Sequence, residues 1–172
     1  MERWVEYYSG LYSRENTVAP SALDAIECHP VVEESDSEPT AEELSKAIDS
    51  LASGKAPGSD GIPPDILKHC KASLLHPLHE VLCQYWREGA VPQDMRDTKI
   101  VTLYKNKGER SDCNNYRGIS LLSIVGKVFA RVILTRLQKM AERVYPESQC
   151  GFRAERSTVD MIFSLRQTPG EV

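Results

Sequence analysis

The feature that most restricts the fold of this sequence is an apolar stripe within residues 123–144. Its members recur every three or four positions, the spacing that aligns side chains on one side of an α-helix: Val125, Val128, Phe129, Val132, Ile133, Leu137, Met140 and Val144. Such a helix is not stable alone in water, because most helical stability comes from packing the apolar side against other elements. The stripe therefore needs other elements to pack against.

Local end signals predict further helices. Thr40 can cap a helix start, Glu43 can reach back to it, and Gly54 follows the helix as a stop signal. The same reasoning predicts helices over residues 2–12, 64–70, 74–88 and 157–167, the last with Ser157 and Asp160 as its capping pair.

One segment has the period of a strand instead. Residues 99–104 alternate and are rich in β-branched and aromatic side chains, residues 105–113 are polar, and residues 116–119 can return as a second strand. The predicted class is therefore α+β, mainly helical, with a short β-hairpin.

The domain organisation follows from composition. Residues 13–39 are rich in Pro, Ser, Asn and carboxylates, which cannot bury a core, so we expect an acidic flexible linker there. It would separate an N-terminal helix, residues 1–12, from a domain at residues 40–167, and residues 168–172 would form a tail.

The charge is divided unevenly along the chain. The net charge of the 172 residues is −4, yet residues 1–95 hold 7 basic and 17 acidic side chains, whereas residues 96–156 hold 13 and 6. The second half is therefore the candidate for binding an anionic partner, since clustered Lys and Arg attract phosphates. Basic residues that merely cover helix surfaces would give the same count.

The sequence also bears on the compartment. The N-terminus has neither the basic nor the apolar region of a secretion signal, and no stretch approaches the length of a membrane span. Five scattered cysteines fit reduced thiols better than a disulfide framework. We expect an intracellular protein, nuclear or cytoplasmic.

The predicted hairpin is the first candidate site. Lys99, Lys105, Lys107, Arg110 and Arg117 could clamp a polyphosphate, because lysines offer mobile charges and arginine a rigid two-pronged donor. Lysines that protect the edge of a solvated hairpin would look the same.

Two other groups favour structural roles. Residues 54–61 hold three glycines and a proline but lack the order of a phosphate-binding P-loop, which indicates a tight turn. Cys70, His76, His79 and Cys83 could place zinc ligands on one helix, but Pro77 lies among them and plain packing is the better interpretation. We therefore expect no metal or other cofactor in this chain.

Four motifs, in order and spacing, resemble reverse transcriptases of non-LTR (LINE-type) retrotransposons. They are GKAPGSDGIPPDILK (54–68), KIVTLYKNKG (99–108), NYRGISLLSIVGKVFARVILTRL (115–137) and SQCGFRAERSTVD (148–160). The resemblance covers residues 40–167, and the helix at residues 2–12 resembles the segment that follows the endonuclease domain in such polyproteins.

The resemblance implies a right-hand polymerase, of which this chain would be the fingers and the start of the palm. It implies a clamp for the nucleotide triphosphate at Lys105, Lys107 and Arg117, and template or nucleotide contacts at Gln149, Gly151, Phe152 and Arg153. One departure is Gly118, where the family usually has proline, so we expect a looser turn there.

The resemblance also implies an incomplete enzyme. The family's catalytic aspartates would follow residue 172, and the chain contains no adjacent pair of aspartates, so we expect a partial RNA-directed DNA polymerase that is inactive alone. Mg²⁺ and the deoxynucleotide triphosphate would belong to the complete enzyme, while the chain would bind an RNA template or RNA/DNA hybrid weakly. The alternative is a non-catalytic nucleic-acid-binding or interaction module derived from a retrotransposon.

A stability expectation follows from this incompleteness. The long helix would normally pack against palm elements, so we expect Val128, Val132 or Leu137 to lose part of its cover here and the chain to be marginally stable.

Overall fold

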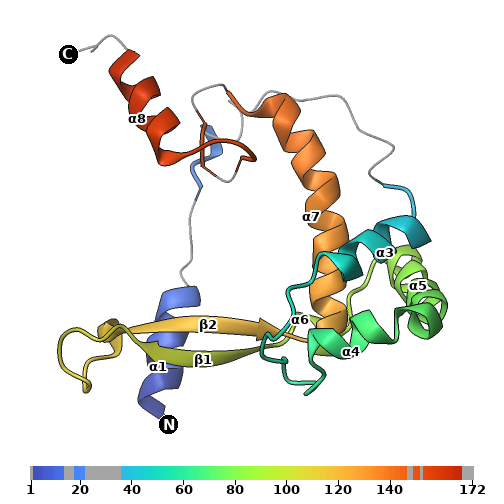
Figure 1. The fold of residues 1–172 in the computed structure, drawn as a ribbon. Helices are drawn as coiled ribbons and strands as arrows, with labels where there is room; N and C mark the ends of the chain where they lie inside the picture. Colours follow the sequence, from blue (N-terminus) through green and yellow to red (C-terminus); the bar gives the residue numbers. More distant parts are fainter. Residues whose placement is uncertain (1, 14–17, 22–35, 147–148, 152, 168–172) are drawn as a thin grey trace.

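A computed structural model of the chain describes residues 2–13, 18–21, 36–146, 149–151 and 153–167. A cluster of helices lies at one side, a two-stranded hairpin extends from it, and the last helix lies apart (Figure 1). This confirms the α+β class. In chain order the elements are α1 (Glu2–Tyr12), α3 (Ala41–Asp49), α4 (Pro64–His69), α5 (Lys71–Glu88), α6 (Gln93–Arg96), β1 (Thr98–Tyr104), the short 3-10 turn η2 (Cys113–Asn115), β2 (Tyr116–Leu122), α7 (Ile124–Val144) and α8 (Thr158–Gln167).

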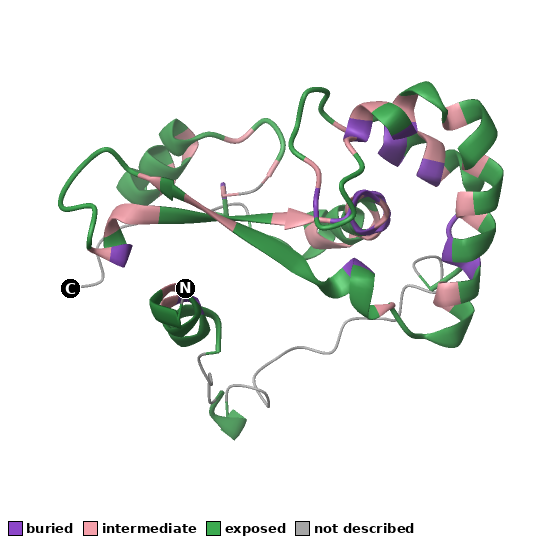
Figure 2. Cartoon of the chain, turned by 90° about the horizontal axis from the view of Figure 1, so that it is seen from below, coloured by how far each residue is buried: buried purple, intermediate pink, exposed green. Residues whose placement is uncertain are grey.

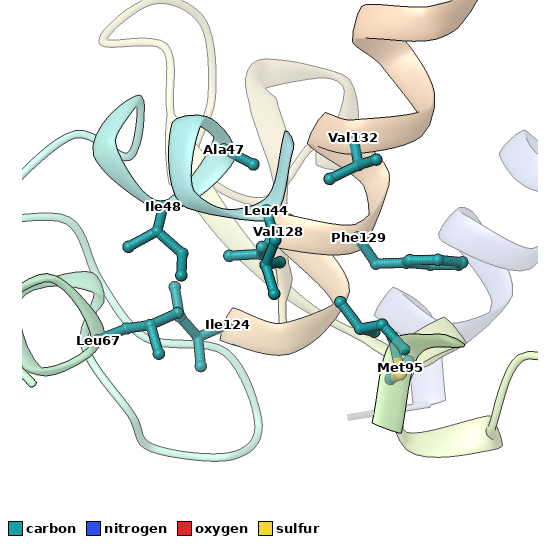
Figure 3. Close-up of a cluster of buried hydrophobic side chains, with 10 residues drawn as sticks. Leu44, Ala47, Ile48, Leu67, Met95, Ile124, Val128, Phe129 and Val132 are labelled. Atoms are coloured by element: carbon teal, nitrogen blue, oxygen red, sulfur yellow. The ribbon is translucent and has the colours of Figure 1, made fainter. Parts of the chain in front are cut away.

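The hydrophobic core lies where α3, α5 and α7 meet. Leu44, Ile48, Leu82 and Val128 are its largest fully buried side chains. Leu44 of α3 lies beside Val128 of α7 in Figure 3, and residues of α4 and α6 close the cluster around this pair. The buried members of the cluster are Leu44, Ala47, Ile48, Leu67, Leu82, Met95, Ile124, Val128, Phe129 and Val132. The first part of the apolar stripe of α7, from Val125 to Ile133, therefore has its partners within the chain.

The cover of α7 differs along the helix. Val128 is 0% exposed and Val132 is 2% exposed. The expected loss of cover therefore does not fall on these two valines, because α3 packs across this part of α7. Leu137 lies further along the helix and is 51% exposed, as expected.

A partly buried ion pair joins α3 to α7. Thr40 and Glu43 form the predicted capping box, with the amide of Glu43 donating to Thr40 Oγ1 at 3.1 Å and the amide of Thr40 donating to Glu43 Oε2 at 2.8 Å. Arg136 of α7 donates to both oxygens of the same carboxylate, at 2.8 and 2.7 Å. These bonds from the Arg136 guanidinium, followed by the bonds from Thr40, lower the pKa of Glu43 to about 2.

Residues 36–39, at the end of the range predicted as a linker, lie against the helices. Trp86 Nε1 donates to the Asp36 carbonyl at 2.9 Å, and Arg87 Nε donates to the Glu38 carboxylate at 2.7 Å. Pro39 is buried. This end of the range is therefore held by α5.

The glycine-rich loop is sharply turned, as predicted. Gly54 and Gly61 both have φ of +68°, a backbone conformation that glycine adopts without strain. Between them, Asp60 Oδ2 accepts a 2.6 Å hydrogen bond from the amide of Ile124, at the start of α7. The loop is therefore fixed to the N-terminus of α7.

The hairpin is an antiparallel pair in which Thr98 faces Leu122 and Tyr104 faces Tyr116. The second strand runs to residue 122, three residues beyond the predicted end. Figure 2 shows most of both strands as exposed or intermediate, whereas the buried residues gather on the helices. The hairpin therefore lies largely outside the core.

Helix α1 packs on one face of the hairpin through aromatic rings. The rings of Trp4 and Tyr116 have centroids 4.9 Å apart, and Tyr8 is buried. A Cβ at position 118 would lie 2.7 Å from Cε1 of Tyr8. Gly118 is thus a strand residue paired with Thr102, and the expectation of a looser turn is wrong. The missing side chain leaves the space that the Tyr8 ring fills, and burial raises the pKa of that phenol.

The last helix, α8, has no buried residue. Ser157 and Asp160 make its predicted cap, with the amide of Ser157 donating to Asp160 Oδ2 at 2.7 Å. Within the part of the chain that the structure describes, no helix combines the length and apolar character that crossing a membrane requires.

Candidate nucleic-acid interface

The hairpin presents two different faces. Because strand residues alternate, Thr102, Tyr104, Tyr116 and Gly118 share the face that α1 covers. The other face carries Val101 with its partner Ile119, Leu103 with its partner Arg117, and the basic residues Lys99 and Lys105. α1 therefore leaves the basic face of the hairpin uncovered.

The three predicted clamp residues lie at the end of this hairpin far from the core. Arg117 stands directly opposite Leu103 and is exposed, with no ion pair to any described carboxylate. Lys105 follows β1, and its Nζ donates to the Asn114 carbonyl at 2.8 Å. Lys107 lies exposed in the tip. The structure thus brings these three cations to one end of the hairpin.

The tip that carries them is ordered by its own contacts. Tyr104 Oη donates to the Gly108 carbonyl at 2.5 Å, and Tyr116 Oη donates to the Arg110 carbonyl at 3.0 Å. The Arg110 guanidinium lies 5.2 Å from the centre of the Tyr104 ring. Arg110 therefore stabilises the tip, and Lys105, Lys107 and Arg117 remain the candidates for contacts with an anionic ligand.

The predicted template contacts lie elsewhere. Gln149 Nε2 donates to the Gly151 carbonyl at 3.2 Å, and Arg153 donates to the carbonyls of Pro146 and Gln149 at 3.2 and 3.3 Å. Phe152 lies outside the described residues. Figure 1 shows this segment beyond the far end of α7, a helix of 21 residues and so about 30 Å long. The structure does not bring it to the hairpin.

His79 and Cys83 of α5 have structural contacts. His79 Nε2 lies 2.7 Å from the Pro39 carbonyl and 3.4 Å from Cys83 Sγ, while Cys70 is exposed. Among the described residues, no three His, Cys, Asp or Glu side chains are grouped so that they could hold a metal ion.

Besides the hairpin, two pockets are possible binding sites. The larger, about 940 Å³, lies among α4, α5, α6 and the start of α7. Its lining is mainly apolar and includes Asp60, Asp94 and Asp97 beside the single cation Lys99, which does not suit a phosphate. The smaller, about 310 Å³, has Lys55, Lys127 and Arg131 in its lining.

Sequence reasoning missed this second basic group. Lys127 and Arg131 are four residues apart in the sequence, which places both on the same side of a helix. This spacing is the one sequence signal for the group. Lys55 lies 72 residues before Lys127, in a loop interpreted as a plain turn, so local patterns could not add it to the group.

Comparison with known proteins gives consistent matches. No family model matches the chain. The chain is 31% identical over 126 residues to the protein named "Probable RNA-directed DNA polymerase from transposon BS" of Drosophila melanogaster, over 72% of this chain. It is 29% identical over 125 residues to the RNA-directed DNA polymerase from mobile element jockey of the same organism, also over 72% of this chain.

A third match reaches nearly the whole chain. The uncharacterized 149 kDa protein of transposon TX1 of Xenopus laevis is 28% identical over 171 residues, 96% of this chain. In each case the chain spans only 13–14% of the length of the relative.

Proposed function

Because the chain is homologous to one segment of the RNA-directed DNA polymerases of non-LTR retrotransposons, we propose that it forms the fingers and the start of the palm of such a polymerase. In this role it binds the RNA template and the incoming deoxynucleotide triphosphate. The relatives that are named as polymerases are much longer than this chain, which spans 14% of their length.

The observation that carries the proposal is the uncovered basic face of the hairpin. Lys105, Lys107 and Arg117 gather at its end, next to the apolar side chain of Leu103. Basic groups suit the triphosphate, and an apolar neighbour suits the faces of nucleotide bases. α1 stabilises the opposite face, so the hairpin is held without its basic face being used.

The catalytic step is not assigned to this chain. Two-metal nucleotidyl transfer needs carboxylates that hold two ions about 3.5–4 Å apart. The described residues offer no such group, and the 172-residue sequence has no adjacent aspartate pair. Mg²⁺ therefore belongs to the proposal only for the complete enzyme, and we propose that this chain alone does not extend a primer.

The second candidate is a non-catalytic nucleic-acid-binding module derived from a retrotransposon. The specific observation in its favour is that Val128 and Val132 are covered by elements of this chain. A chain that supplies its own core can fold as a unit, whatever its origin.

Two assays test the proposal. Primer extension on an oligo(dT)-primed poly(rA) template, with magnesium or manganese, should show no incorporation above a heat-killed control. Incorporation that survives extensive purification would contradict the claim of inactivity.

The second assay measures dTTP binding by calorimetry. The variant Lys105→Ala/Lys107→Ala/Arg117→Ala should bind about tenfold more weakly, since three charge-assisted contacts are lost at an exposed site. A variant with three cations removed elsewhere, Lys46→Ala/Lys139→Ala/Arg143→Ala, serves as the charge-matched control. Equal losses in the two variants would contradict a clamp at the hairpin.

A further inference from the structure

The smaller pocket is built by three segments that are distant in the sequence. The glycine-rich loop contributes Lys55, and α7 contributes Lys127 and Arg131, one turn apart. Leu122 at the end of β2 lies with Ala130 and Leu134 in the apolar part of the lining. The pocket encloses about 310 Å³, near the lower limit of the usual size of ligand sites, roughly 300 Å³.

The loop that carries Lys55 is held firmly against α7. A Cβ at Gly58 would lie 2.3 Å from the Leu122 carbonyl oxygen, so the loop backbone approaches the end of β2 more closely than any other residue type permits. Lys127 Nζ donates to the Ala56 carbonyl at 3.4 Å, and Asp65 accepts from the amide of Gly54 at 3.0 Å. These contacts hold the loop in place, and with it Lys55 at the edge of the pocket.

The positive charge of the pocket is not balanced by the residues around it. No carboxylate lines the pocket, and no described carboxylate forms an ion pair with Lys55, Lys127 or Arg131. The two aspartates of the adjoining segment, Asp60 and Asp65, accept hydrogen bonds from backbone amides. Three cations in the lining of one pocket, with no carboxylate beside them there, favour an anionic ligand.

The uncharged side chains of the lining limit the kinds of ligand that the pocket can bind. Apart from the three cations it consists of Leu51, Ala52, Pro64, Leu122, Ala130 and Leu134. No hydroxyl or amide side chain is present to read the edge of a base. The pocket can therefore hold a phosphate together with a sugar or the face of a base.

We propose that this pocket is a second binding site, for a phosphodiester of single-stranded RNA. The guanidinium of Arg131 engages the phosphate with paired donors, Lys55 and Lys127 add point charges from two sides, and the apolar lining receives the sugar or base. This inference rests on the proposed function, namely that the chain binds nucleic acid. It adds a contact that is separate from the hairpin.

The test is binding of a fluorescein-labelled 12-residue oligouridylate to the whole 172-residue chain over a series of salt concentrations. The variant Lys55→Ala/Arg131→Ala should bind about tenfold more weakly, and its log–log salt slope should be smaller by up to about 0.7, since the pocket holds one phosphate and each neutralised phosphate contributes roughly 0.7 for single strands. The control variant Lys46→Ala/Lys139→Ala removes two cations outside the pocket and should keep the wild-type slope.

Further comparisons in this assay distinguish failure of the pocket proposal from failure of the proposed function. If the pocket variant binds RNA like the wild type while the triple hairpin variant does not, the pocket proposal is overturned and the proposed function stands. If the wild-type chain does not bind the oligouridylate at all, both fail. If excess dTTP displaces the RNA from the triple hairpin variant, the pocket holds free nucleotides and the proposal of a strand site is overturned.

Folding of the pocket variant is checked by its urea unfolding midpoint. Because both altered side chains contact the pocket and not the core, the midpoint should stay close to that of the wild type. The variant Arg131→Lys provides a milder test: it should keep the salt slope but bind more weakly, since lysine lacks the paired donors of arginine. Affinity equal to that of the wild type would contradict the role given to Arg131.

Discussion

The helical region and the hairpin are stabilised in different ways. Leu44, Ile48, Leu82 and Val128 are fully buried among helices of one cluster. The hairpin instead depends on α1, whose Tyr8 ring lies over Gly118, and on hydrogen bonds within its tip. One part of the chain therefore holds the fold, while another part has a basic face that α1 leaves uncovered.

Two arginines illustrate the same difference. The Arg136 side chain is 10% exposed and donates to both oxygens of Glu43, so its charge is paired within the fold and joins α3 to α7. Arg117 is exposed on the uncovered face of the hairpin. A count of basic residues treats the two alike, and only their surroundings separate a structural cation from a candidate ligand contact.

The largest effect should come from the core. Leu82→Ala removes a fully buried side chain of α5, so the free energy of unfolding should fall by about 2–5 kcal/mol. Leu137→Ala is the matched control, because Leu137 is half exposed, and should cost less than about 0.5–1 kcal/mol. Urea unfolding measures both. Similar losses for the two variants would show that the core is not where the structure places it.

The second largest effect should be a dependence of folding stability on pH. In the folded chain the pKa of Glu43 is about 2, below its ordinary value of 4.5, so its contribution to stability is present above pH 4.5 and is lost as pH falls toward 2. We expect a contribution of about 1–3 kcal/mol, since the carboxylate is partly exposed. Between pH 6 and pH 3 the wild type should therefore lose more stability than Glu43→Gln.

The control for this pH prediction is Glu42→Gln, which alters the neighbouring but exposed pair with Lys46. Lys46 also lowers the pKa of Glu42, but this pair is exposed to solvent, so the loss of stability between pH 6 and pH 3 should stay close to that of the wild type. A Glu43→Gln variant with the wild-type pH profile would show that the pair with Arg136 does not join the helices.

A smaller effect should appear at the contact between α1 and the hairpin. Gly118→Ala places a methyl group in the space of the Tyr8 ring, which should cost about 1–2 kcal/mol of local stability. In a Tyr8→Ala background the same change should cost almost nothing, because the ring is absent. Hydrogen exchange of amides in β2 and α1 measures the difference. Additive effects of the two substitutions would contradict the contact.

The sequence predicts the local parts of this structure well. The stripe of α7, the capping box of Thr40 and Glu43, and the alternation of residues 99–104 depend on neighbours within a few positions, so periodicity and end signals suffice. The two-stranded hairpin follows from the same local patterns.

The long-range contacts could not be predicted in this way. Tyr8 lies 110 residues before Gly118, and no local signal reveals that a missing side chain serves an aromatic ring. Likewise, the cover of Val128 by α3 and the approach of Lys55 to Arg131 depend on how distant elements dock. The resemblance to polymerases indicated the clamp residues but gave no hint of these contacts.

The central claim is that the hairpin binds the ligand while the helical region holds the fold. The most direct measurement is hydrogen exchange of the whole chain with and without the 12-residue oligouridylate. The account predicts slow exchange in α3 and the first half of α7 under both conditions, and new protection on adding RNA in residues 99–121 and in the loop at residues 54–61. Protection confined to α5 and α6, with none in the hairpin, would contradict it.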